Sequence, residues 1–272
     1  MDDRYGLLRQ LASEFHVESL SIRGQYGVIQ GPSTDNVILR WYATTGTWSE
    51  ATNTMVADRL TEGGTFIDVG ANLGLTTIPA ARNPQVRVIA FEPDPTCFRY
   101  LQANVAANCP AAAVTLHNAA VFDEATDLTF EIASANHGDN RVRVTAAPGA
   151  LQEEPGEVVT VRAVSLDQVV DVRGRLVVKI DTQGAEPFVV KGARATLARA
   201  ELVFLEYWPY GMARLAADVS IIHEAIGDFA SIALRREGGT ETTRLSHAEA
   251  LVALTALDQD DPEEYVDIIL AR

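Results

Sequence analysis

The chain has 272 residues, of which 47% are hydrophobic, so it is long enough to form one large domain around a packed core. It carries 22 basic and 37 acidic residues, and the net charge of -15 would repel a long polyanion such as DNA or RNA unless a local basic patch intervened. We interpret the short basic pairs, Arg141 with Arg143 and Arg235 with Arg236, as solvated, and therefore expect no nucleic-acid partner.

The opening residues 1–15 are acidic and amphipathic, and they lack both the basic region and the continuous apolar region of a secretory signal. No apolar run reaches the roughly 18 residues that a membrane-spanning helix needs. We therefore expect a cytoplasmic protein without membrane insertion. Cys97 and Cys109 lie 12 positions apart across a predicted helix, several turns from each other, so no disulfide is expected between them.

Residues 1–60 are interpreted as an N-terminal extension that packs on a core domain formed by residues 61–272. The apolar patterning of the extension predicts an initial helix, short strands around 22–29 and 37–42, and a helix over 50–60. This mixture of short elements differs from the regular alternation that follows it.

From Thr65 onward, strand and helix patterns alternate. The apolar periodicity predicts strands at 65–70, 86–92 and 114–121, and helices at 74–82 and 95–108. The second of these helices is well marked, because Asp94 is a suitable N-cap and Pro95 occupies the first helical position. Alternation of this kind is typical of a parallel sheet.

The segment 127–170 interrupts the alternation. Predicted strands at 128–132 and 158–164 flank residues 134–156, which contain Gly, Asn and Pro, and we interpret the segment as an inserted hairpin or lid. The alternation then resumes, with strands at 176–181, 202–207, 231–236 and 265–270 and helices at 185–199 and 218–228. The whole pattern predicts an α/β fold with seven main strands.

The first motif follows an apolar strand and precedes a helix. Gly70 and Gly74 are interpreted as leaving room for a ligand to approach the backbone. Asp68 at the mouth of this loop would repel a pyrophosphate, but it suits a cationic ligand such as the amino acid end of S-adenosylmethionine, which carries an ammonium and a sulfonium. The glycine spacing also does not fit G-x-G-x-x-G, so NAD is the weaker interpretation.

The next predicted strand ends at a second acidic residue. Glu92 lies 18 residues beyond Gly74, where a carboxylate at a strand end can accept both hydroxyls of a ribose. NAD and S-adenosylmethionine both carry a ribose diol, so Glu92 indicates a nucleoside and only the preceding loop distinguishes the two. Taken singly, Asp68 or Glu92 is equally well explained as a helix cap or a solvated loop acid.

A second constellation occupies residues 176–186, LVVKIDTQGAE, where an apolar strand leads to Asp181, a turn and Glu186. Ligands of open α/β sheets lie beyond the carboxyl ends of the strands, so four acids are expected to converge on one crevice: Asp68, Glu92, Asp181 and Glu206. We interpret Asp181 as a site residue, whereas Glu186 is expected to complement the dipole of its helix.

Two further side chains are candidates for chemistry. Lys179 precedes Asp181 by two residues, so both lie on one face of the strand, where a buried lysine would need a carboxylate partner. His137 lies in the sequence HGDNR, within the insertion that could cover the crevice, and is a candidate for substrate contact. His117, inside a predicted strand, is interpreted as a core or face histidine.

With these motifs in hand, the chain resembles the FkbM family of S-adenosylmethionine-dependent methyltransferases from roughly Gly46 to Trp208. The resemblance rests on an ordered set of motifs: TGTWSEA at 45–51, FIDVGANLGLTT at 66–77, FEPDP at 91–95, NAAV at 118–121 and KIDTQGAEPFVVKGA at 179–193. It implies a class I, Rossmann-like fold, in which a mostly parallel seven-stranded sheet has helices on both faces. Members of the family mostly methylate hydroxyl groups on sugars, glycolipids and polyketides, so the implied partner is a small-molecule hydroxyl acceptor.

The resemblance also implies residue roles. The implied cofactor contacts are Asp68, Gly70, Asn72 and Gly74 for the methionine part, Glu92 with Pro93 for the ribose, Asn118 and Ala119 near the adenine, and Glu50 as a further contact. The catalytic candidates are Asp181, His137 and Lys179. Gln183 departs from the family pattern, because many relatives carry glutamate there in a D-V-E-G-x-E version of the motif.

Several alternatives stay open. Asp181 or His137 could take the proton of an acceptor hydroxyl, or a divalent metal on Asp181, Glu186 and Glu206 could lower its pKa, although metal assistance is not favoured. An NAD-dependent oxidoreductase and a non-catalytic S-adenosylmethionine-binding protein are the rival functions. A homo-oligomer is also compatible with the sequence. Aromatic residues suited to stacking on a glycosyl acceptor, or equally to core packing, are Trp41, Tyr42, Trp48, Tyr207, Trp208 and Tyr210.

Overall fold

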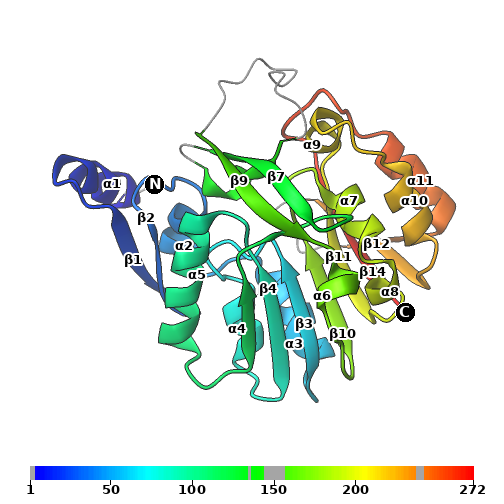
Figure 1. Cartoon of the computed structure of the whole chain (residues 1–272), viewed down its shortest axis with the longest axis horizontal. Coiled ribbons are helices and arrows are strands. Elements are labelled where there is room, and N and C mark those ends of the chain that lie inside the picture. Colours follow the sequence, from blue (N-terminus) through cyan, green and yellow to red (C-terminus); the bar gives the residue numbers. More distant parts are fainter. Residues whose placement is uncertain (1–3, 134–135, 144–156, 237–241) are drawn as a thin grey trace.

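The computed structural model describes residues 4–133, 136–143, 157–236 and 242–272. Its centre is an eight-stranded sheet with the order β13-β12-β14-β11-β10-β3-β4-β5 (Figure 1). The strands are β3 (Gly64–Val69), β4 (Val86–Phe91), β5 (Val114–His117), β10 (Leu176–Ile180), β11 (Leu202–Tyr207), β12 (Ser231–Arg236), β13 (Thr243–Leu245) and β14 (Val266–Ala271). The five strands from β11 to β5 are parallel, and β14 lies antiparallel between β11 and β12.

All seven predicted main strands are present in this sheet, and β13 adds an antiparallel eighth at its edge. The strand predicted over 114–121 is divided, however. The chain leaves the main sheet after His117, because the amide of Asn118 donates to the carbonyls of Glu92 and Pro93 at 2.9 and 3.0 Å and holds a turn there. The remainder of the predicted strand, β6 (Ala120–Val121), belongs to another sheet.

Helices cover both faces of the main sheet. On one face, α3 (Glu50–Arg59), α4 (Thr77–Ala81) and α5 (Pro95–Asn108) share a core cluster with Phe66 of β3. On the other, α6 (Leu166–Val169), α7 (Glu186–Lys191), α8 (Arg194–Leu197), α10 (Ser220–Ile226) and α11 (His247–Thr255) pack with Ile67. Burial on both faces explains why these strands read as nearly continuous apolar runs.

Two predicted helices differ in extent from the structure. The helix predicted over 74–82 is confined to α4, and the one predicted over 185–199 is divided into α7 and α8. The division falls at Gly192, where a Cβ would collide with the backbone of Phe122 and Asp123, so the chain turns at this close approach. The predicted helix 95–108 is confirmed at both ends as α5, and Asp94 Oδ1 accepts the Thr96 N–H at 2.7 Å as its cap.

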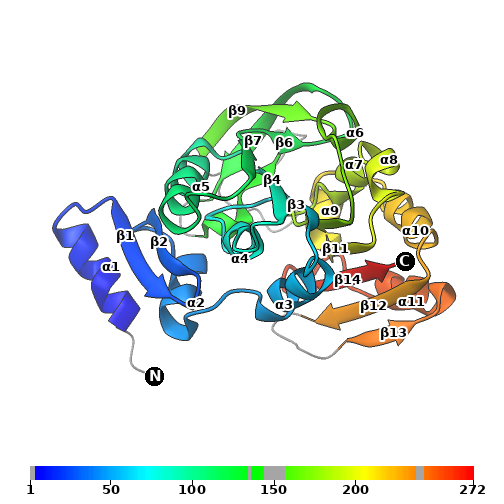
Figure 2. The same cartoon turned by 90° about the horizontal axis from the view of Figure 1, so that it is seen from below.

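The N-terminal segment consists of α1 (Arg4–Glu14), a hairpin of β1 (Ser19–Gly24) and β2 (Gly27–Pro32), and α2 (Ile38–Thr45). Figures 1 and 2 show α1 and the hairpin at one end of the molecule and α10 and α11 at the other. The strand predicted at 37–42 is wrong, because this segment forms α2. Asp35 Oδ1 accepts the N–H groups of Val37 and Leu39, and the helix buries Ile38, Leu39 and Tyr42.

The predicted insertion contributes β7, β8 and β9 to a separate four-stranded sheet with the order β6-β9-β7-β8. The predicted strands 128–132 and 158–164 pair antiparallel as β7 (Thr126–Ile132) and β9 (Glu157–Val164). The turn η1 (His137–Asp139) and β8 (Arg141–Val142) follow β7. Most of the predicted lid, residues 134–135 and 144–156, lies outside the described residues.

The expectation about the cysteines is met within the described residues. Cys97 and Cys109 are both buried and free, so no disulfide joins them. None of the helices found there has both the length and the apolar character needed to cross a bilayer. The remaining helix, α9 (Pro209–Arg214), follows β11 and carries the buried Tyr210, which lines the site described next.

Candidate active site

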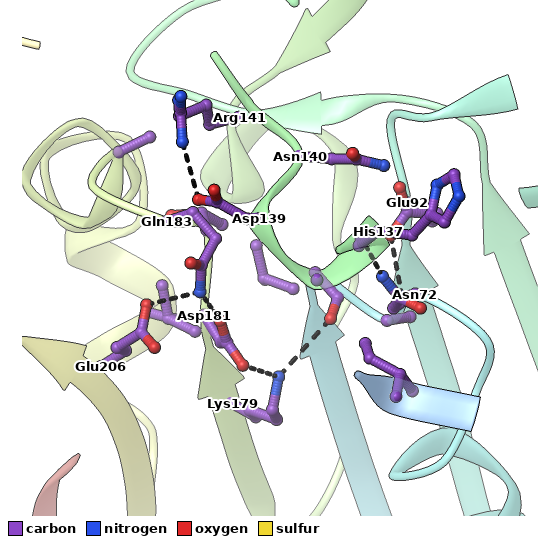
Figure 3. Close-up of a pocket in the computed structure, with 18 of the residues that line it drawn as sticks. Asn72, Glu92, His137, Asp139, Asn140, Arg141, Lys179, Asp181, Gln183 and Glu206 are labelled. Carbon is purple, nitrogen blue, oxygen red and sulfur yellow. Dashed lines mark hydrogen bonds and ion pairs between the residues drawn. The ribbon is translucent and has the colours of Figure 1, made fainter. Parts of the chain in front are cut away.

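A cavity of about 700 Å³ lies beyond the carboxyl ends of β3, β4, β10 and β11. Its wall includes Gly70 and Asn72 after β3, Glu92 after β4, and Asp181 after β10. Residues of η1 and the segment after it also line the cavity, and Figure 3 shows His137, Asp139 and Arg141 of this part of the chain among the lining side chains. The cavity therefore occupies the position at which open α/β sheets bind ligands.

The two loop glycines are both required by packing within the protein. Gly70 has a φ of +82°, and a Cβ there would collide with the carbonyl oxygen of Asp181. Gly74 has a φ of +90°, and its Cβ would lie 2.8 Å from the Leu101 side chain. Gly74 does not line the cavity. Both glycines thus allow two protein segments to approach each other. Gly70 also lines the cavity, so its contact with a ligand stays a prediction, whereas Gly74 is placed away from the cavity.

Glu92 is 4% exposed and lies at the cavity wall. Its two carboxylate oxygens accept the backbone N–H groups of Asn72 and Asp94, each at 2.8 Å. Burial, opposed in part by these hydrogen bonds, raises the pKa of Glu92 to about 8. Each oxygen keeps acceptor capacity beyond one hydrogen bond, so the side chain is suited to the predicted contact with a ribose diol.

Asp68 does not line the cavity, although its position at the end of β3 predicts that it should. Its side chain is fully buried; Oδ2 accepts the Thr77 hydroxyl at 2.7 Å, and Oδ1 lies 3.8 Å from Lys179 Nζ. Burial raises the pKa of Asp68, and the nearby ammonium opposes this shift. Asp68 is therefore placed beneath the cavity, where its carboxyl group can balance the charge of Lys179 but does not contact a ligand in the cavity directly.

Lys179 and Asp181 form the ion pair that their spacing predicts, with 3.1 Å between Nζ and Oδ2. Burial acts to lower the pKa of Lys179, but the carboxylates of Asp181 and Asp68 raise it, and the net shift is upward. The side chain is therefore held as an ammonium and is unsuited to accept a proton. Its structural contribution is to hold the Asp181 carboxylate in place.

Gln183 links two acids of the wall, as Figure 3 shows. Its Nε2 donates to Asp181 Oδ1 and to Glu206 Oε2, both at 2.9 Å. Burial, followed by the negative charge of Asp181, raises the pKa of Glu206 well above its usual range. A glutamate at position 183 could not donate both hydrogen bonds, so this departure from the family pattern has a structural consequence.

Glu186 is fully buried and does not line the cavity. Its carboxylate accepts the N–H groups of Thr182 at 2.6 Å and Gly184 at 3.0 Å, and the Thr182 hydroxyl at 2.9 Å. It thus fixes the loop that follows Asp181, a more specific role than complementing the helix dipole. The alternative of a metal held by Asp181, Glu186 and Glu206 is not supported, since Glu186 faces its own loop.

The histidines are placed differently from one another. His137 lines the cavity, but Figure 3 shows it beside Glu92 and Asn72, across the cavity from Asp181. Its backbone carbonyl accepts the Asn72 amide at 2.8 Å. The structure therefore does not bring the two candidate proton acceptors together. His117 stacks on Phe91 with 4.7 Å between ring centroids, which agrees with its interpretation as a face histidine.

The remaining predicted cofactor residues divide into two groups. Pro93 and Ala119 line the cavity. Asn118 and Glu50 are exposed and do not, and Asn118 instead holds the turn after β5. The residues near Glu50 that do line the cavity are Trp48, Ser49 and Thr52.

Sequence reasoning missed two arginines, which it interpreted as solvated. Arg141 is 8% exposed, lines the cavity, and pairs with Asp139 at 2.7 Å and with Glu131 at 3.5 Å. Arg235 is 5% exposed and pairs with Asp267, another wall residue, at 2.7 Å. The polar HGDNR sequence was the available signal for the first arginine, whereas nothing local marks the second.

The sheet order and the cavity at the carboxyl ends of its parallel strands are those of the class I methyltransferase fold. Residues 68–223, more than half of the chain, match the model described as Methyltransferase FkbM domain, and the chain belongs to this family. The resemblance seen in the motifs is thereby confirmed, and it favours methyl transfer over the NAD-dependent alternative. The matched range begins at Asp68, so the segment 45–51 lies outside it.

Solved structures of similar fold include other methyltransferases. Precorrin-6y C5,15-methyltransferase from Geobacter metallireducens has a TM-score of 0.38 and 13% identity, over 83% of this chain and 92% of that chain. TYW2 from M. jannaschii, in complex with AdoMet, has a TM-score of 0.43 and 13% identity, over 93% of this chain and 85% of that chain. A comparison with curated proteins gives no match.

Proposed function

We propose that the protein transfers a methyl group from S-adenosylmethionine to a hydroxyl group of a small molecule, with a sugar or another polyol as the favoured acceptor class. The observation that carries this proposal is the division of one cavity into two walls. Glu92 and the loop at Gly70 to Asn72 form one wall, and Asp181, Gln183 and Glu206 form the other (Figure 3).

The first wall suits the cofactor. Asn72 has a φ of +49°, and the backbone of residues 70–73 follows the cavity beside the buried Glu92 carboxylate. Glu92 would accept the ribose hydroxyls, and Pro93 and Ala119 would contact the nucleoside. When bound, S-adenosylmethionine supplies a methyl group made electrophilic by the sulfonium. The chain's own residues must then align the acceptor and remove its proton.

The second wall suits proton removal. An alcohol is too weak an acid to ionise unaided at neutral pH, so a base must take its proton as the oxygen bonds to the methyl carbon. Asp181 is our candidate because it borders the cavity and Lys179 stabilises its carboxylate. Gln183 fixes its orientation. Lys179 and Gln183 are accordingly positioning residues in this proposal.

The acceptor side combines acids with aromatic rings. Asp267 joins Asp181 and Glu206 there, and the aromatic side chains lining the cavity include Trp48, Trp208, Tyr210 and Tyr265. Carboxylates accept hydrogen bonds from hydroxyl groups, and ring faces pack against the C–H face of a sugar. This chemistry supports a polyol or glycosyl acceptor.

The test is methyl transfer from labelled S-adenosylmethionine to a panel of glycosides and polyols by the wild type, Asp181→Asn and Asp171→Asn. Asp171 is a matched control because its side chain is 68% exposed. We expect Asp181→Asn to lower the rate by about a hundredfold to ten-thousandfold, the usual contribution of a positioned base, and Asp171→Asn to leave it unchanged. Cofactor binding should survive both substitutions. A fully active Asp181→Asn variant would refute the assignment of the base.

A further inference from the structure

A buried group of potential metal ligands lies behind the cofactor wall. Asp94, Cys97 and His137 each offer one ligand atom, and these atoms all lie within 4.8 Å of one another. They are 0%, 0% and 8% exposed, respectively. Asp94 and Cys97 belong to the start of α5, whereas His137 comes from η1. Among the described residues, this is the one such group of three or more side chains.

The histidine ring is incompletely satisfied. Its Nε2 lies 3.1 Å from the Thr34 hydroxyl, but Nδ1 has no hydrogen-bond partner within the described parts of the chain. A buried polar atom without a partner is costly, and such atoms in folded proteins usually indicate a missing water or ion. Asp35 Oδ2 is another buried atom in the same condition.

The surroundings are also rich in buried carboxyl groups. Asp35 and Glu92 are buried acids close to this group, 0% and 4% exposed. Within the described residues, no lysine or arginine forms an ion pair with Asp35, Glu92 or Asp94. Buried carboxylates are normally paired with a cation or coordinate a metal.

We propose that Asp94, Cys97 and His137 bind a divalent transition-metal ion, with zinc as the favoured ion. A carboxylate oxygen, a thiolate sulfur and an imidazole nitrogen are ligands of the type that zinc takes, and three of them leave one tetrahedral position for water. Binding replaces the thiol proton of Cys97, which is released to solvent, so affinity should rise with pH.

A metal ion at this site would stabilise the structure and would not take part in methyl transfer. Asp94 donates its N–H to Glu92, and the His137 carbonyl accepts the Asn72 amide. An ion here would therefore tie η1 and α5 to the residues of the cofactor wall. It would lie on the side of the cavity away from Asp181, as the position of His137 in Figure 3 shows.

The test replaces zinc with Co²⁺ in the full-length protein and measures the thiolate-to-cobalt charge-transfer absorption, together with zinc content by mass spectrometry. The variants are Cys97→Ala and the matched control Cys109→Ala, since Cys109 is the second buried cysteine at the other end of α5. We expect the wild type and Cys109→Ala to hold equimolar metal and show the absorption, and Cys97→Ala to lose both.

A thermal readout keeps the test independent of methyl transfer. Added zinc should raise the Tm of the metal-stripped wild type and of Cys109→Ala, because an ion that binds only the folded state stabilises that state. It should leave the Tm of Cys97→Ala and of His137→Gln unchanged. A folded wild type that retains no zinc and shows no charge-transfer band would overturn the proposal. That result would leave the cofactor proposal untouched.

Discussion

At the scale of single residues, buried acids carry most of the site's chemistry, and their neighbours decide what each can do. Asp68 and Asp181 both lie beside Lys179, but only Asp181 borders the cavity. The sequence correctly placed Lys179 and Asp181 on one face of a strand, because side-chain alternation is a local property. It could not predict that Asp68 lies beneath the cavity, since that depends on packing against α4 and β10.

The buried carboxyl of Glu186 predicts a pH effect on stability. Burial raises its pKa to about 7, so in the folded state it binds a proton more tightly than in the unfolded chain. Its contribution to stability should therefore fall as the pH rises from the ordinary glutamate range toward 7. Urea unfolding at several pH values should show wild type losing stability relative to Glu186→Gln over this interval. The exposed Glu224→Gln variant should follow the wild type, and parallel curves for all three proteins would contradict the expectation.

At the scale of elements, sequence prediction succeeded where local signals and tertiary packing agree. The bounds of α5 follow from Asp94 and Pro95, which act within one turn of the helix. The failure at α2 has the opposite cause. Its sequence VILRWY is rich in β-branched and aromatic residues that favour a strand, but the cap at Asp35 and burial of Leu39 and Tyr42 favour a helix.

The junction of β3 and β10 gives a prediction at this scale. Gly70→Ala should destabilise the protein by about 2 kcal/mol or more, because the new Cβ combines left-handed strain with a collision against the Asp181 carbonyl. Gly174→Ala is the matched control: its φ is +71°, but the nearest atom lies 3.9 Å away, so only strain of about 1 kcal/mol is expected. Denaturant unfolding measures both. Equal losses would show that the approach of the two strand ends is not the constraint.

At the scale of the whole molecule, the N-terminal segment contributes to both core and site. Leu39, Tyr42 and Val56 belong to the core cluster on one face of the sheet, and Asn104 and Asn108 of α5 exchange hydrogen bonds with the backbone of β2. Trp48, Ser49 and Thr52 line the cavity. The sequence indicated that residues 1–60 pack on the core domain, but not that they supply part of the cavity wall, because that contact joins segments distant in the chain.

These contacts predict that residues 61–272 do not fold alone. Removing residues 1–60 would expose apolar side chains of α4, α5 and β3 that the segment covers, and would open the cavity. We expect the shortened chain to unfold without a cooperative transition and to bind no S-adenosylhomocysteine. Circular dichroism during thermal unfolding is the measurement. A cooperative transition together with binding like that of the full chain would show the segment to be dispensable.

The central claim is most directly tested by isothermal titration of S-adenosylhomocysteine into the wild type, Glu92→Gln and Glu50→Gln. Glu92→Gln removes a carboxylate at the cavity wall, and Glu50→Gln removes one at an exposed position outside the cavity. We predict that the wild type and Glu50→Gln bind S-adenosylhomocysteine with the same affinity. In Glu92→Gln the affinity should fall tenfold or more, which is a loss of binding free energy on the order of 1.4 kcal/mol. A folded wild type that binds no S-adenosylhomocysteine would contradict the proposed function. Equal binding by all three proteins would instead remove Glu92 from the cofactor site.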